Sequence, residues 1–252
     1  MINWNGISSD SLNVIVEYIP SRTIARKKIN TYSVPGRTGD IIDDEGAFDN
    51  YSQKYNIFIE GDEISNLPLR ARAVAEWLMA PNGYAVLRDN YDINSFRYAY
   101  FQGPLDIGTW FNIHGQAAIE FVCDPHRYLD EGQKEITVSG SAYLINPTAF
   151  KAKPLIRIFG TTGGAGTVTL AQKTIQILTI SDNMYVDCFT GQAYTREDSI
   201  IIDGVELSGA DDVSVNDQIL CTDFPVLGKG GNHVSFTGDI SSLTIVPRWW
   251  TL

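Results

Sequence analysis

The residues best suited to metal chemistry are cysteines and histidines, and in this chain they are few and scattered. They are Cys123, Cys188 and Cys221, with His114, His126 and His233. A zinc site needs four ligands, and because the sequence has no CxxC pair, no local motif indicates such a site. An odd number of distant cysteines also builds no disulfide framework. We therefore expect buried thiols that pack as small apolar groups, and no metal or other cofactor.

Two glycine-rich segments could hold a phosphate group through backbone amides. The segment GTTGGAGT begins at Gly160. It lacks the Gly-Lys-Ser/Thr that would place a lysine on the phosphates, and no helical pattern follows it. The segment GKGGN, residues 228–232, precedes a strand pattern. We interpret both segments as turns between strands.

The carboxylates offer oxygen ligands and acid–base groups, but no pattern organises them. Asp40, Asp43, Asp44 and Glu45 form a cluster without the alternating Asp-x-Asp-x-Asp-Gly spacing of a calcium loop, and we interpret it as a solvated or intersubunit loop. Carboxylate pairs for glycoside cleavage converge only in space, and nothing singles out two of the 30 acidic residues. GxSxG and HExxH are absent, as is a local Cys–His signature. We predict that the protein is not an enzyme.

The overall charge disfavours nucleic acid as a ligand. The 252 residues include 19 Lys and Arg against 30 Asp and Glu, a net charge of −11, whereas gripping phosphates needs an excess of basic residues. No apolar run approaches the roughly 20 residues of a membrane span, and the first residues lack the basic start and apolar core of a signal peptide. We expect a protein made in a cytoplasm, with no tight DNA binding and no membrane insertion.

The elements that must position any site are almost all strands. Short runs rich in Val, Ile, Thr and Tyr recur between Gly, Asn, Asp and Pro, a spacing typical of sandwiches and barrels. One segment, over about residues 66–80, has helical periodicity instead, and Pro81 ends it. Its apolar stripe consists of Leu67, Ala71, Val74, Ala75 and Leu78. The sequence predicts a mainly β protein with one helix in its first half.

A change in character near residues 130–150 divides the chain into two predicted domains. Polar and proline residues typical of turns are frequent there, and the helical segment lies only on the N-terminal side of this region. We predict an N-terminal β-rich domain over 1–133 that contains the helix, and an all-β sandwich over 134–252. The first has eleven basic and eighteen acidic residues, a net charge of −7, and the second has eight and twelve, a net charge of −4.

Four short motifs follow one another along the chain. They are the turn Val34-Pro35-Gly36-Arg37-x-Gly39, the helix with Trp77, the segment Asp124-Pro125-x-Arg127-Tyr128, and Pro247-Arg248-Trp249. We expect a strand to end at the third motif, because Pro125 lacks a ladder donor. The order and spacing of the four motifs resemble the distal tail protein (Dit) family of long-tailed bacteriophages and prophages.

The resemblance implies a structural hub of a bacteriophage tail tip or baseplate. Members of that family form a hexameric ring through the N-terminal domain, with a channel for DNA, and their C-terminal domain is a galectin-like sandwich. The implied partners are other copies of the chain, the tail tube protein and a tail-tip or tail-associated hub protein, with receptor-binding and tape-measure proteins as further candidates. The protein would be assembled in the host bacterial cytoplasm and lie at the distal tip of the virion. The family supplies no catalytic, cofactor-binding or metal-binding residue.

Two other functions stay open, and both concern host adsorption. A carbohydrate-binding module would place Trp249, Trp250 or loop tyrosines on an exposed face. A tail-associated glycan hydrolase would place two carboxylates about 5–9.5 Å apart in a cleft. The composition, 11% aromatic and only 19% charged, is typical of chains with interface cores and favours an interaction protein.

Overall fold

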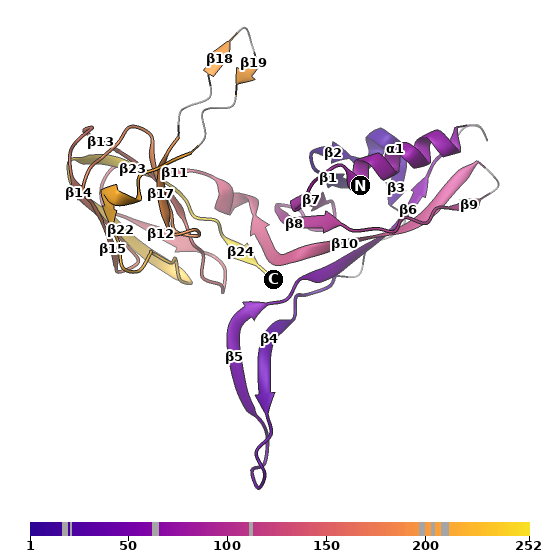
Figure 1. Cartoon of the computed structure of the whole chain (residues 1–252), viewed down its shortest axis with the longest axis horizontal. Helices are drawn as coiled ribbons and strands as arrows, with labels where there is room; N and C mark the ends of the chain where they lie inside the picture. Colours follow the sequence, from indigo (N-terminus) through magenta and orange to yellow (C-terminus); the bar gives the residue numbers. More distant parts are fainter. Residues whose placement is uncertain are drawn as a thin grey trace. The chain divides into compact units, whose positions relative to one another are not determined.

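A computed structural model describes the chain except for residues 17–19, 21, 62–65, 111–112, 197–199, 203–204 and 208–211. Its elements are mostly strands paired in several sheets (Figure 1), which confirms the prediction of a mainly β protein. The chain divides into two compact units, Met1–Arg127 with Leu252, and Tyr128–Thr251. We call them unit 1 and unit 2. That each is an independently stable domain, with the division at 133/134, stays a prediction.

Unit 1 is built on one sheet whose strands pair in the order β2, β1, β7, β8, β10, β6 and β3, with β9 beside β10. These strands are β1 Ile2–Trp4, β2 Ile7–Ser8, β3 Val14–Val16, β6 Tyr51–Ile59, β7 Ala85–Asp89, β8 Ser95–Phe101, β9 Gly108–Trp110 and β10 His114–Leu129, and a 3₁₀ turn, η1, spans Ser9–Leu12. In β6 every second residue from Tyr51 to Ile59 is buried, as expected of a strand with one face on the core.

The helix α1, Leu67–Met79, lies within the predicted segment and packs against this sheet (Figure 1). Two tryptophans hold it there through reciprocal hydrogen bonds. Trp77 Nε1 donates to the Trp4 carbonyl, and Trp4 Nε1 donates to the Leu78 carbonyl, both at 3.3 Å. The Trp4 ring in turn lies 4.8 Å from the ring of Phe121 on β10, measured between centroids. The prediction of a helix here is confirmed, and Trp77 lies in it as part of the core.

Unit 2 consists of two sheets, in the orders β11, β23, β13, β16, β17, β20 and β12, β22, β14, β15, β21. The first contains β11 Ile136–Val138, β13 Leu155–Gly160, β16 Met184–Asp187, β17 Gln192–Thr195, β20 Val213–Ser214 and β23 Ile240–Val246. The second contains β12 Ala142–Asn146, β14 Gly166–Leu170, β15 Lys173–Ile177, β21 Ile219–Leu220 and β22 Gly230–Gly238. Buried residues of both sheets, such as Ile156 and Leu170, form one core. Unit 2 is therefore a β-sandwich, as predicted.

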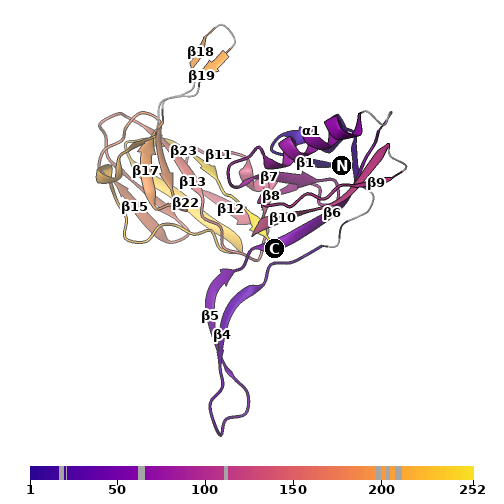
Figure 2. The same ribbon diagram turned by 45° about the vertical axis from the view of Figure 1, so that its right-hand side comes forward.

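The shorter elements complete the two units. In unit 2 the 3₁₀ turns η2 Asp130–Gln133 and η3 Asn216–Gln218 flank the sheets, and β24 is Trp250–Thr251. A separate hairpin pairs β18 Ile200–Ile202 with β19 Val205–Leu207. In unit 1 a second hairpin pairs β4 Lys27–Tyr32 with β5 Ile41–Phe48. Figures 1 and 2 show this hairpin extending away from the sheet of unit 1.

The first glycine-rich segment connects β13 to β14 as a turn, as predicted, and the Asp239 carboxylate accepts a hydrogen bond from the Ala165 N–H there at 3.0 Å. For the second segment the prediction is only partly right, because residues 230–232 already belong to β22 and pair with β12. The Asn232 side chain donates to the carbonyls of Gly228 and Gly230, both at 2.9 Å, and so fixes the entry into that strand.

The cysteines are free thiols, buried at Cys123 and Cys188 and half-buried at Cys221. Burial raises the pKa of the Cys123 and Cys188 thiols to about 12, so both pack as neutral groups. Among the described residues no three His, Cys, Asp or Glu side chains are placed to share a metal ion. In that same part of the chain no helix combines the length and the apolar character needed to cross a membrane.

Limited proteolysis of the full chain tests the two-domain prediction. We expect cleavage near residues 130–150 to leave two resistant fragments, because each unit has its own hydrophobic core. Mass spectrometry of the fragments locates the cut. A junction that resists cleavage, together with one cooperative thermal transition for the whole chain, contradicts the prediction.

Candidate interaction surface

The hairpin of β4 and β5, with its tip at residues 33–40, is the most exposed structure of unit 1, and we call it the arm. The predicted turn Val34-Pro35-Gly36-Arg37-x-Gly39 forms its tip, where the Arg37 N–H donates to the Val34 carbonyl at 3.1 Å. Gly36 and Gly39 have φ angles of +81° and +82°, a left-handed conformation that strains any residue with a Cβ. The motif is therefore a tight reversal between two strands.

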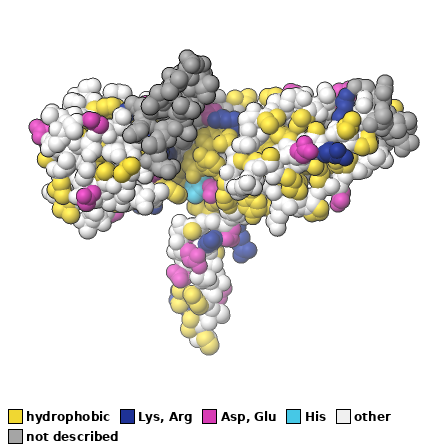
Figure 3. All heavy atoms as spheres, turned by 45° about the horizontal axis from the view of Figure 1, so that its top comes forward, with side chains coloured by type: hydrophobic (Ala, Val, Ile, Leu, Met, Phe, Trp, Pro, Cys, Tyr) yellow, Lys and Arg dark blue, Asp and Glu magenta, His cyan; other side chains and the backbone are white. Residues whose placement is uncertain are grey.

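Apolar side chains lie on both faces of the arm. Tyr32 is opposite Ile41, and Thr31 is opposite Ile42. Because opposite residues share a face and successive residues alternate, Tyr32 and Ile42 lie on different faces. Tyr32 is 54% exposed and Ile42 is 66% exposed. Figure 3 shows apolar atoms along the arm, interspersed with charged ones.

The acidic cluster is exposed to solvent, as expected, but the expectation of a loop is wrong. Asp43, Asp44 and Glu45 lie in β5, and only Asp40 precedes the strand. Acidic residues are unfavourable in strands, but cross-strand partners offset this here. Lys27 forms an ion pair with Asp44 and, by hydrogen bonding to it, holds the pKa of Asp44 below its usual value; similarly, the side-chain amide of Asn30 donates to Glu45 Oε1 at 2.9 Å.

The base of the arm is tied to the sheet by Arg127. Its Nη1 donates to Asp92 Oδ2 at 2.9 Å, and its Nη2 donates to the Thr23 carbonyl at 3.1 Å. Arg22, one residue before Thr23, donates to the Tyr91 carbonyl at 2.7 Å. The Arg127 side chain is only 6% exposed, so both bonds are shielded from water. Arg127 of the third motif thus joins β10, the β7–β8 connection and the start of the arm.

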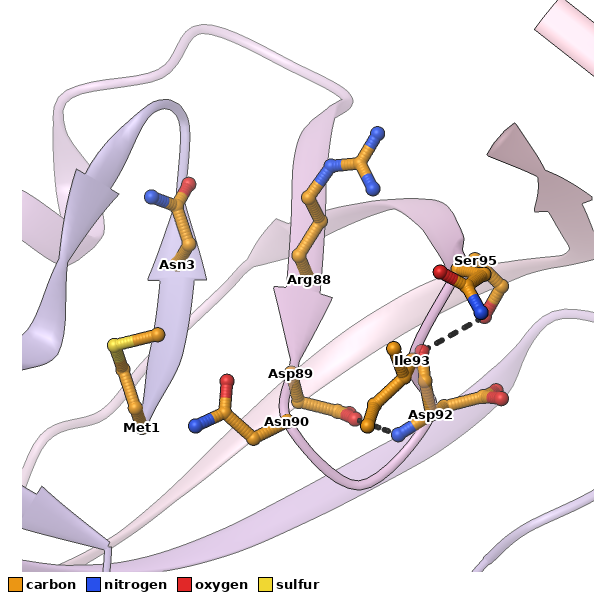
Figure 4. A pocket seen from close by; sticks show the side chains of 9 residues that line it. Met1, Asn3, Arg88, Asp89, Asn90, Asp92, Ile93 and Ser95 are labelled. Carbon is orange, nitrogen blue, oxygen red and sulfur yellow. Dashed lines mark hydrogen bonds between the residues drawn. The ribbon is translucent and has the colours of Figure 1, made fainter. Parts of the chain in front are cut away.

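The β7–β8 connection is itself fixed by Asp89 (Figure 4). Asp89 Oδ1 accepts from the N–H groups of Tyr91 and Asp92 at 3.1 and 2.9 Å. Its other oxygen accepts from the Tyr55 hydroxyl at 2.7 Å and from Arg97 Nη2 at 3.0 Å. Burial raises the pKa of Tyr55 far above its usual value, so that hydroxyl stays a donor. The cavity of about 470 Å³ beside this connection is lined by Asp89 and Asp92 among others.

The rest of the third motif departs from the expectation of a strand end. β10 continues through Pro125 to Leu129, four residues beyond the proline. The pairing of β10 with β6 ends where Cys123 lies opposite Tyr51. Because Pro125 lies beyond this pair, its lack of an N–H removes no hydrogen bond between β10 and β6. Asp124 Oδ1 accepts from the His126 N–H at 2.9 Å. Tyr128, the last residue of the motif, is the first residue of unit 2.

The fourth motif is structural within unit 2. Arg248, at a left-handed φ of +58°, donates from Nη1 and Nη2 to the two oxygens of Asp187, at 2.7 and 3.0 Å. Burial raises the pKa of Asp187, but these bonds and the Phe189 N–H outweigh it, and the net shift is downward. Trp249, which follows Pro247, is 3% exposed. The alternative with Trp249 on an exposed face is therefore wrong.

Trp250 is also engaged within unit 2. Its ring stacks on Phe150 with centroids 4.5 Å apart and planes 21° apart, and its Nε1 donates to the Lys151 carbonyl at 2.9 Å. The two tryptophans therefore serve packing in this fold.

Sequence reasoning missed Asp89, Asp92 and Arg97, which hold the base of the arm, and it missed the arm itself. The signal for the arm was the tip motif lying between two segments that can pair, KKINTY and IIDDEGAF. In a common type of turn, an aspartate side chain accepts hydrogen bonds from backbone N–H groups two and three residues later. Asp89 forms such a turn with Tyr91 and Asp92.

No protein-family model and no curated protein matches this sequence. The fold, however, is similar to the crystal structure of the phage SPP1 Dit protein (gp 19.1), with a TM-score of 0.73 and 15% identity, over 100% of this chain and 98% of that chain. It is also similar to a chain of the phage P2 baseplate in its activated conformation with Ca, with a TM-score of 0.51 and 8% identity, over 92% and 89%. The predicted resemblance to Dit is confirmed at the level of the fold.

Replacing Arg127 tests the anchor of the arm. We expect Arg127→Met to lower the free energy of unfolding by about 2–3 kcal/mol, because the Asp92 carboxylate loses its nearest cationic partner. Removing one partner of a fully buried pair costs somewhat more. Here the Asp92 side chain is 23% exposed, and Arg97 Nη2 still lies 3.8 Å from its Oδ2. The matched control is Arg37→Met at the exposed tip, expected to change it by less than about 0.5 kcal/mol. Urea unfolding of the full chain measures both, and equal midpoints for the two variants contradict the anchor.

Proposed function

We propose that this chain, which has the fold of Dit, is the structural hub of a bacteriophage tail tip or baseplate. Unit 1 forms a hexameric ring that joins the tail tube protein to the tail-tip or tail-associated hub protein and leaves a channel for DNA. The chain assembles in the host cytoplasm and lies at the distal end of the tail in the virion. SPP1 Dit is described as a hub of the adsorption apparatus in phages that infect Gram-positive bacteria, and this supports the same role here.

The arm is the observation that carries the proposal. A two-stranded ribbon is marginally stable in water by itself, and this one keeps Tyr32, Val34, Ile41 and Ile42 exposed. Burying such apolar surface is worth about 25 cal/mol per Å². The arm therefore gains its stability from a partner surface, and a second copy of the chain is the partner that is present in every assembly.

Contacts made by an arm produce rings for a geometric reason. The arm of one copy lies against a different surface of the next, so the two sides of the contact are unlike. Such a contact repeats until it closes on itself. The sheet of unit 1 ends in β2 and β3, and free strand edges are ready to pair with another chain. The number six comes from the resemblance to Dit.

The role is structural, and no reaction is proposed. The similar solved chains belong to a hub and a baseplate. Receptor-binding or tape-measure proteins are further candidate partners, as expected of a hub at the end of a tail.

Charged substitutions on the arm test the ring. We expect the wild type to reach about 167 kDa in light scattering, six copies of 27.9 kDa. The double variant Tyr32→Asp, Ile42→Asp should be monomeric but folded, with an unchanged circular-dichroism spectrum, because both side chains are exposed and outside the core. Ile145→Asp in unit 2, exposed to 72% in the wild type, is the control and should leave the mass unchanged. A wild type that stays monomeric at every concentration, or an arm variant that keeps the full mass, contradicts the ring.

The charge of the predicted N-terminal domain, residues 1–133, leads to a prediction about DNA. With −7 over residues 1–133, six copies would carry about −42, and like charge repels the duplex. A wall that neutralised about 6–10 phosphates would hold DNA tightly and stall its passage. We expect no gel shift of duplex DNA at physiological salt. A clear shift, or a ring whose channel is lined by Arg26, Lys27 and Lys28, contradicts this.

A further inference from the structure

The outer face of the first sheet of unit 2 carries a row of aromatic and cationic side chains. Arg157 on β13 is opposite Tyr185 on β16, and Tyr185 is opposite Tyr194 on β17. The two tyrosine rings are stacked, with centroids 5.5 Å apart and planes 11° apart. The Arg196 guanidinium lies 5.3 Å from the Tyr194 ring. Stacking and cation–π contacts hold these side chains in fixed orientations.

A cleft of about 350 Å³ opens at one end of this row. Its lining includes Asp187, Gln192, Tyr194, Arg196, Asp212 and Arg248. The volume is within the range of small-molecule sites. The cleft lies within unit 2. Asp187, Gln192 and Tyr194 belong to β16 and β17, whereas Arg196 and Asp212 lie one residue beyond β17 and one residue before β20.

The charges of the cleft cancel in two planar pairs. Arg248 bridges both oxygens of Asp187, at 2.7 and 3.0 Å. Arg196 donates from Nε to Asp212 Oδ1 at 2.7 Å and from Nη2 to Oδ2 at 2.9 Å. The hydrogen bond from Arg196 holds the pKa of Asp212 below its usual value, so it remains an acceptor at neutral pH. The described residues that line the cleft thus present strong donors and acceptors without net charge.

These groups keep hydrogen-bonding capacity for a ligand. An arginine has five N–H donors and a carboxylate has about four acceptor positions, and within the described part of the chain the bonds between Arg196 and Asp212 use two of each. A pair of neighbouring hydroxyl groups can accept from the guanidinium and donate to the carboxylate at once. A pyranose ring supplies such neighbouring hydroxyls on its rim.

We propose that this cleft binds a neutral saccharide. The paired aspartates disfavour phosphate and carboxylate ligands, the paired arginines disfavour metal cations, and the polar lining disfavours an apolar molecule. Cleavage of the sugar is not part of the proposal, because a glycosidase needs a carboxyl group with a raised pKa, whereas the pKa values of Asp187 and Asp212 are lowered. The site does not depend on the ring of unit 1.

The test uses the full chain on an array of neutral and phosphate-bearing bacterial polysaccharides, followed by calorimetric titration with the neutral oligosaccharide that binds best. We expect a dissociation constant in the millimolar to high micromolar range that does not change when salt is raised, since screening acts on charged ligands. Asp212→Asn should weaken binding roughly tenfold, the loss of one hydrogen bond to a charged group. Its melting temperature should stay unchanged, because Asp212 and Arg196 are 43% and 49% exposed.

The matched control is Asp223→Asn, which removes another exposed ion pair, with Lys173, elsewhere on unit 2 and should leave the affinity unchanged. Three results would each overturn the proposal. They are an array on which no neutral saccharide binds, binding confined to phosphate-bearing polymers, and equal affinity in the wild type and Asp212→Asn. Light scattering of the same samples reports the ring separately, so the failure of one idea is distinguishable from the failure of the other.

Discussion

The buried bonds of Arg127 are the interaction on which the geometry of unit 1 depends. One guanidinium reaches the carboxylate of Asp92 and the carbonyl of Thr23, which are far apart in the sequence but adjacent in the fold. Asp92 is available because Asp89 has already folded the β7–β8 connection around its own oxygens. The arm therefore begins from a rigid point, although the arm itself has almost no buried side chain.

In unit 2 a second arginine, Arg248, likewise holds a short motif in place through an aspartate. Arg248 adopts a left-handed backbone and binds Asp187 on β16, and its N–H donates to the Gly132 carbonyl at 2.6 Å. A Cβ at Gly132 would meet the backbone of Trp249 at 2.4 Å, so glycine is required for this close approach. In both units a short motif near the end of the unit is held by a shielded arginine–aspartate pair, and not by packing alone.

Local patterns were enough to predict the strands, the helix and the turn at the tip of the arm. Alternation in β6 and the apolar stripe of α1 are readable because each depends on a few neighbouring residues. The site depends on pairs that the fold brings together, such as Asp92 with Arg127 and Asp212 with Arg196, and no periodicity encodes them. Two expectations failed for a related reason. Pro125 is tolerated in β10 because β6 no longer pairs with the strand at that point. The acidic residues of β5 are tolerated because β4 supplies partners such as Lys27.

The composition of the arm has a consequence for the single chain. Its two strand edges and several isoleucines face water, and such ribbons seed aggregation when they are flat and uncharged. Here Lys27 and Lys28 precede Ile29, and Asp43, Asp44 and Glu45 follow Ile42. These charges act as gatekeepers, because stacking identical arms in register would place like charges on top of one another. The same residues that make β5 an improbable strand therefore oppose pairing of the arm with its own copies edge to edge.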